Sequence, residues 1–196
     1  MTTHPADAPA APVVITHVLG DFELRVGMKQ GTMDHLRAED SDWGRVVKAH
    51  GIAEAALNAR LAGRFPERGP GVRRLPLMHR KTGKLALLAS VGWLQAHETP
   101  FLTVLHRLRS VLVHDVSYLD FDLDENSARW SAGTRTRFVD AVFDSWHASN
   151  KLNLNVDWQE AEKADIRFLL CATIWRFIYD TDELLRGHRP PSCSVG

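Results

Sequence analysis

The chain has 196 residues, of which 44% are hydrophobic and 24% are charged, and its formal net charge at pH 7 is zero. This length suits one well-buried core and leaves little room for a second full domain. A balanced charge excludes an overall positive field that would attract nucleic acid. The two cysteines, Cys171 in a helical pattern and Cys193 in the tail, lie too far apart to suggest a disulfide framework, and no apolar run has the length of a membrane span, so we expect a reduced, cytoplasmic protein.

The two ends of the chain differ in composition from the rest. Residues 1–12, rich in Ala and Pro, and residues 189–196 are expected to be disordered tails, with a single helical domain at 13–188 between them. The secondary structure expected for residues 13–26 is ambiguous. Their β-branched content on either side of a Gly-Asp pair is typical of a short hairpin, but an irregular lead-in fits as well.

From Ser41 onward the apolar spacing becomes helical. We expect Ser41 or Asp42 to cap a helix that carries one apolar stripe and ends before Pro66. Glycine and proline then predict a loop over residues 67–76. A second helix is expected at about residues 82–95.

Residues 101–114, FLTVLHRLRSVLVH, form the most regular amphipathic segment of the chain, with apolar residues at i, i+3 and i+4. Thr99 is the expected N-cap and Pro100 the expected first helical residue. Residues 116–131 should be a connection, in which LDFDLD at 119–124 is a candidate for a brief extended piece.

Two more helices are expected after this connection. One covers residues 135–149, and a link at 150–156 joins it to a long final helix at 158–185, whose middle is apolar nearly all round. Such a helix is either central to the core or half covered by a partner. The pattern as a whole predicts an all-α bundle of about five or six helices, with a short extended segment left open.

Candidate functional residues lie near the end of the 101–114 segment. Arginine offers a planar fork of donors that suits phosphate, and histidine transfers protons near neutral pH, so Arg109 and His114 could act together on a phosphodiester. The R-x4-H spacing is not diagnostic in itself, because the chain has two further copies, Arg45–His50 and Arg74–His79. In a regular helix the two side chains point about 140° apart. They would converge only if the helix ends or distorts, or if a second copy of the chain supplies the complement.

Two other groupings follow from helical spacing. Ser110 and His114 are i, i+4 and share a face with Arg107, so these three form the polar cluster that a straight helix supports. The alternative is that they are the solvated side of the helix, with cations near its C-terminus complementing the helix dipole. His50 and Glu54 are also i, i+4, and we favour a structural polar contact at the edge of the core over a tuned acid–base pair.

The order of these segments resembles the HEPN superfamily of helical domains, and within it the mannitol operon repressor-like proteins. The resemblance covers about residues 43–124 and is carried by WGRVV at 43–47, GIAEAAL at 51–57, KTGKLALLASVGW at 81–93, LRS…H at 108–114 and LDFD at 119–122. The family prefers Asn or Asp directly after the motif arginine, where this chain has Ser110.

The resemblance implies an RNA-directed homodimer of toxin or defence type with metal-independent endoribonuclease activity. His114 would be the general acid or base on the ribose 2′-hydroxyl or the leaving oxygen, Arg109 would hold the phosphate, and Ser110 would add a hydrogen bond. Glu54 matches an acidic position of the family and could orient Arg109 through an ion pair. The second implication is a non-catalytic regulatory or protein-interaction domain, linked to transcription without direct DNA contact.

Signatures of other chemistries do not occur in the sequence. The ten histidines are scattered without an HExxH or CxxC spacing, and no glycine-rich phosphate loop or basic recognition helix is evident. We therefore expect no metal, no cofactor, no membrane association and no sequence-specific DNA binding. RNA and a protein partner, such as an antitoxin, remain the expected partners besides a second copy of the chain.

Overall fold

A computed structural model describes residues 21–125, residue 141 and residues 166–187, and every structural statement below concerns these residues. The chain is all-helical, as the apolar spacing predicts, and no strand occurs in the described part. The elements are α2 (Thr32–Arg37), α3 (Asp42–Arg64), η1 (Pro66–Arg68), α4 (Gly69–Arg73), α5 (Lys84–Ser90), α6 (Glu98–His114), η2 (Val116–Tyr118) and α10 (Ile166–Leu185).

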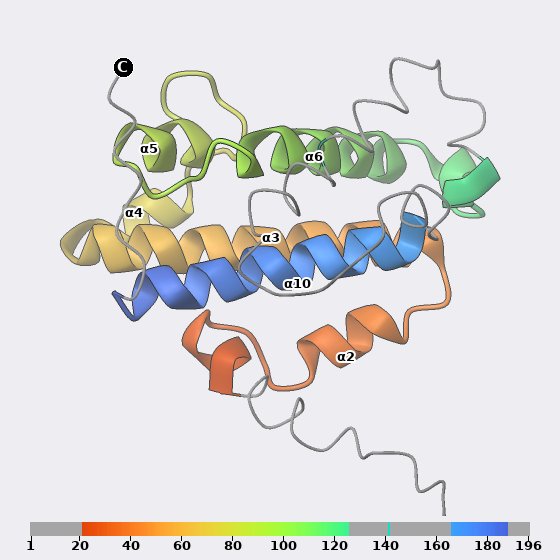
Figure 1. Ribbon diagram of the computed structural model, residues 1–196. Coiled ribbons are helices and arrows are strands. Elements are labelled where there is room, and N and C mark those ends of the chain that lie inside the picture. Colours follow the sequence, from red (N-terminus) through yellow and green to blue (C-terminus); the bar gives the residue numbers. More distant parts are fainter. Residues whose placement is uncertain (1–20, 126–140, 142–165, 188–196) are drawn as a thin grey trace, which may run out of the picture.

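Helices α3 and α10 lie side by side along their length and form the centre of the molecule (Figure 1). Helices α5 and α6 cover one side of this pair, and α2 covers the other. Apolar side chains from α3, α6 and α10 meet in the core, among them Ala56, Leu57, Leu61, Phe101, Leu105, Ile174, Phe177 and Ile178. Burial of these stripes is the main stabilising term, because each helix presents one apolar face that water would otherwise solvate.

The central helix α3 begins and ends where the sequence predicts. The Ser41 hydroxyl accepts the backbone N–H of Gly44 at 3.1 Å, which satisfies one of the free donors of the first turn. The helix ends at Arg64, because Pro66 cannot continue it and disfavours the helical conformation at Phe65.

Three sequence expectations need correction. Residues 67–76 are not simply a loop, because η1 and α4 occupy 66–73. The second helix, α5, is shorter than the expected 82–95. Helix α6 begins at Glu98 rather than beyond Thr99, since the Glu98 carboxylate is drawn into the core and accepts the backbone N–H of Gln95 at 2.7 Å.

The expected extended segments are also absent from the described residues. Residues 21–25 are helical, which contradicts the hairpin for that part, and residues 13–20 lie outside the described residues. Residues 119–124 pass through a turn into a helical turn instead of a strand. The final helix is seen from Ile166 onward as α10, while its expected start at 158–165, the link at 150–156 and both tails fall on residues that are not described. Of the helix expected at 135–149 only residue 141 is described, and it is helical.

A buried ion pair joins the three central helices. Arg60 of α3 is fully buried and forms two parallel hydrogen bonds, of 2.7 and 2.8 Å, with the carboxylate of Glu98 on α6. Its remaining donors reach the Thr181 hydroxyl at 2.9 Å and the backbone oxygens of Trp93 and Phe177. The guanidinium also lies 4.4 Å above the Phe177 ring. Because every donor is satisfied, the charge can stay in the core, and it fixes α6 and α10 relative to α3.

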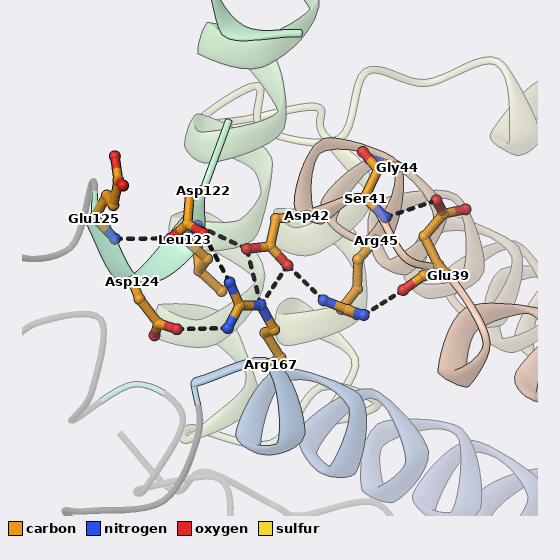
Figure 2. Close-up of polar contacts among 10 residues, drawn as sticks. All are labelled: Glu39, Ser41, Asp42, Gly44, Arg45, Asp122, Leu123, Asp124, Glu125 and Arg167. Carbon is orange, nitrogen blue, oxygen red and sulfur yellow. Dashed lines mark hydrogen bonds and ion pairs between the residues drawn. The ribbon is translucent and has the colours of Figure 1, made fainter. Parts of the chain in front are cut away.

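A second cluster of polar contacts holds the acidic LDFDLD segment, residues 119–124, against the helices (Figure 2). Asp42, the first residue of α3, is buried and accepts hydrogen bonds from Arg45, from Arg167 of α10 at 2.8 and 2.9 Å, and from the backbone N–H of Leu123 at 2.8 Å. Arg167 also pairs with Asp122 and Asp124. These contacts attach the segment after α6 to the start of α3 and of α10.

We predict that Arg60→Met lowers the free energy of unfolding by about 3–5 kcal/mol, because it leaves the Glu98 carboxylate buried without its cation. Arg60→Met combined with Glu98→Met should recover a large part of this loss. Arg186→Ala removes one of the two arginine partners of Asp182 and leaves Arg25 in place, so it should change stability by less than about 1 kcal/mol. Urea unfolding measures all three, and equal stability of Arg60→Met and the wild type would contradict the role of the pair.

Candidate functional site

Two histidines from different helices meet at the interface of α3 and α6. The Nε2 atom of His50 and the Nδ1 atom of His106 are 3.1 Å apart, and the ring centroids are 5.3 Å apart. His50 is buried with 8% of its surface exposed, whereas His106 is half-buried. At this distance one ring nitrogen donates a hydrogen bond and the other accepts it. The pair can therefore hold and exchange protons at the edge of the core.

Three charged side chains surround this pair. Arg109 lies one turn after His106 on α6, and Glu54 lies one turn after His50 on α3. Lys84, the first residue of α5, is almost fully buried, and its Nζ atom is 2.5 Å from a Glu54 oxygen. We call these five residues the histidine cluster. It combines two imidazoles with two fixed cations and one carboxylate.

Burial and the neighbouring cations keep both imidazoles neutral at pH 7. Desolvation, followed by His106, Arg109 and Lys84, lowers the pKa of His50 to about 4, with Glu54 acting in the opposite direction. Desolvation and Arg109 likewise lower the pKa of His106. Burial acts to raise the pKa of Glu54, but the hydrogen bond from Lys84 and the nearby cations outweigh it, so this pKa is lowered and the carboxylate stays charged. The local excess of positive charge suits an anion.

The structure separates the two residues of the R-x4-H motif. Arg109 is half-buried and acts electrostatically on His50, His106 and Glu54, whereas His114 is exposed at the last position of α6. Because α6 continues as a helix to His114, the two side chains lie on different faces.

Of the remaining predicted residues, two belong to the histidine cluster and two do not. Ser110 is half-buried and Arg107 is exposed on α6. His50 and Glu54 both belong to the histidine cluster, but the ion pair of Glu54 is formed with Lys84 rather than with Arg109.

Sequence reasoning missed His106 and Lys84. A signal for His106 was present, since it is three residues before Arg109 and about 60° from it around the helix, on the same face. The approach of His50 to His106 spans 56 residues of sequence, and that of Lys84 to Glu54 spans 30. Such pairings depend on how the helices pack, which spacing within one helix does not reveal.

A second group of ligand-type side chains lies beside the buried ion pair. Potential metal-binding atoms of His97, Glu98 and Asp180 are within 4.8 Å of one another, the one set of three or more such residues in the described ranges. However, Glu98 is bound by Arg60, and Asp180 is bound by Arg176 at 2.8 and 3.1 Å. Because two guanidinium groups already balance the two carboxylates, a divalent ion would add uncompensated charge to the core. We therefore assign this group a structural role.

Comparison with known proteins gives no match: no protein-family model, no curated protein and no solved structure is similar to this chain. No helix of the described residues is both long and apolar enough to cross a membrane.

The lowered pKa of His50 predicts a pH-dependent stability. Between about pH 6.5 and pH 4 the unfolded chain binds a proton at this histidine and the folded chain does not, so the free energy of unfolding falls as the pH falls. The full effect is about 3 kcal/mol, present above pH 6.5 and lost by pH 4. Urea unfolding at several pH values should show that His50→Gln flattens this dependence, while the exposed-site variant His114→Gln keeps it. Equal slopes for His50→Gln and the wild type would contradict the burial of a neutral imidazole.

Proposed function

We propose that this chain is a HEPN-like helical protein that binds RNA and cleaves it without a metal ion, using the histidine cluster. The observation that supports this most is the contact between His50 and His106, 3.1 Å apart, with Arg109 beside them. Two imidazoles and a guanidinium are a sufficient set of groups for phosphodiester cleavage through the 2′-hydroxyl.

Within this proposal each side chain has a distinct task. His106 is the more exposed imidazole and would accept the proton of the ribose 2′-hydroxyl, whose oxygen then attacks phosphorus. Arg109 would bind the phosphate oxygens and stabilise the charge that develops on them. His50 would orient His106 and share the proton that His106 has taken from the 2′-hydroxyl. This proton can then pass to the leaving 5′-oxygen as the bond between that oxygen and phosphorus breaks. Lys84 would hold Glu54 and add to the positive potential.

A second candidate function, a regulatory domain that binds another protein or a second copy of itself, is favoured by a different observation. Val111 on α6 is 51% exposed, and Leu119 just beyond the helix is 61% exposed. Large apolar side chains exposed on and just after one helix can contact a partner protein. Val111 is three residues before His114 on α6, so a homodimer formed through this end of the helix would place that histidine at or near the interface.

The assay that tests the proposal is degradation of single-stranded RNA in the presence of EDTA. We predict that the wild type cleaves and that His106→Ala and Arg109→Gln each lower the rate by about 100-fold or more, because each removes a group that acts on the reacting phosphate. His114→Ala is the matched control on the same helix and should keep the rate within about threefold of the wild type.

Two results would overturn this assignment. If His114→Ala abolishes cleavage and His106→Ala does not, Arg109 and His114 act together and the imidazoles of His50 and His106 are not the catalytic groups. If the purified wild type degrades no RNA, the catalytic proposal fails and the interaction domain becomes the better description. In both cases circular dichroism of each variant shows whether the helices are intact.

A further inference from the structure

We propose that an exposed basic segment, residues 64–81, binds the phosphate backbone of single-stranded RNA and directs the strand to the histidine cluster. The segment contains six arginine or lysine residues and one acidic residue, Glu67, although the chain as a whole has no net charge. The rest of the chain is therefore net negative, and positive charge is concentrated in this one stretch. RNA binding by the basic segment does not depend on the proposed cleavage, whereas delivery of the strand to the imidazoles rests on it.

The cations of the basic segment are exposed at one end of the bundle. Helix α3 ends within the segment, and η1, α4 and the start of α5 follow at the same end of the molecule (Figure 1). In the described part of the chain, no carboxylate forms an ion pair with any of these side chains, and none of them forms a side-chain hydrogen bond. The six exposed residues are Arg64, Arg68, Arg73, Arg74, Arg80 and Lys81. Their charges are thus available to an external polyanion.

The backbone of the basic segment is held in place by the core. Val72 and Leu77 are buried between the exposed cations. The backbone N–H of Lys84 donates a hydrogen bond of 2.9 Å to the oxygen of Pro76, which closes the loop at 77–83. A polyanion that binds here meets cations on an ordered backbone, so little chain entropy is lost on binding.

The composition of the basic segment favours a phosphate-bearing strand over a lipid surface. Five of the six cations are arginines, whose planar fork of donors suits phosphate oxygens. A segment that binds a membrane surface inserts apolar side chains beside its cations. The large apolar side chains that are exposed in the described ranges all lie outside residues 64–81. Contacts with phosphate alone position a strand without reading its sequence.

The basic segment lies next to the histidine cluster. Lys84, three residues after Lys81, belongs to that cluster through its contact with Glu54. Glu54 is ten residues before Arg64 on α3, which is about 15 Å along the helix axis. Because neighbouring phosphates of a strand are only a few ångströms apart, one RNA can contact the basic segment and Arg109 through different phosphates.

Fluorescence anisotropy with an RNA whose 2′-hydroxyls are methylated measures binding without cleavage. We predict that Arg73→Gln/Arg74→Gln and Arg80→Gln/Lys81→Gln each lower the affinity about tenfold, because each double variant removes two phosphate contacts. The logarithm of the affinity for a single strand falls with the logarithm of the salt concentration by about 0.7 per phosphate contacted. Each double variant should therefore make this slope shallower by about 1.4.

The matched control is Lys29→Gln/Arg37→Gln, which removes the same charge from exposed positions just before and on α2, on the other side of the central helix pair. This variant should bind the RNA within about twofold of the wild type. An equal loss of affinity in the control would show that only the net charge matters and would overturn the surface. Vesicles of phosphatidylserine and phosphatidylcholine, at the same concentration of accessible phosphate, should not displace the RNA, and displacement would assign the segment to a lipid surface instead.

The binding and cleavage proposals can fail separately. If the wild type binds no RNA, or if both variants of the basic segment keep its affinity, the surface is wrong whatever the cleavage assay shows. If the wild type binds through the segment and degrades no RNA, the surface stands and the proposed function fails. If both proposals hold, the segment variants should raise the KM for RNA about tenfold and leave kcat within about twofold, and a loss of kcat at unchanged KM would contradict the delivery of the strand.

Discussion

The packing of α6 against α3 is the constraint on which the candidate site depends. Two contacts fix it: near the start of α6, Glu98 is bound by the buried Arg60, and near its end the Trp43 indole donates a hydrogen bond of 3.0 Å to the backbone oxygen of Leu112. His106 lies between these contacts, directly opposite His50. Because both ends of α6 are fixed, the separation of the two imidazoles is set by the scaffold rather than by flexible loops.

The buried ion pair of Arg60 and Glu98 and the histidine cluster both lie between α3 and α6, but they differ in their capacity for chemistry. Around Arg60 all donors are satisfied and charges are balanced, so a ligand could enter only at the cost of breaking a buried pair. Around His50 and His106 the rings are neutral, Arg109 is half-buried, and the fixed charges leave a positive excess. The second arrangement is the one in which an anion gains favourable contacts and protons can move.

Much of the helical scaffold can be predicted from local sequence signals, whereas the candidate site can be predicted only in part. Ser41 and Pro66 predicted the ends of α3, because capping and proline geometry act within a few residues. The start of α6 was misplaced because Glu98 pairs with Arg60, 38 residues away, which outweighs the local preference for a threonine cap. Arg109, His50 and Glu54 were identified from the sequence, but their convergence with His106 depends on helix packing.

In our proposal, His50, His106 and Arg109 form one anion-binding acid–base site. The most direct test is a pH titration of the imidazole signals by NMR, with and without an RNA whose 2′-hydroxyls are methylated and therefore cannot attack. We expect the pKa values of His50 and His106 to lie below the usual value for histidine in the free protein and to rise when the RNA binds, while the position of the His114 signals changes little on addition of RNA. If the RNA leaves His50 and His106 unchanged, or shifts His114 alone, the histidine cluster is not the site of RNA binding.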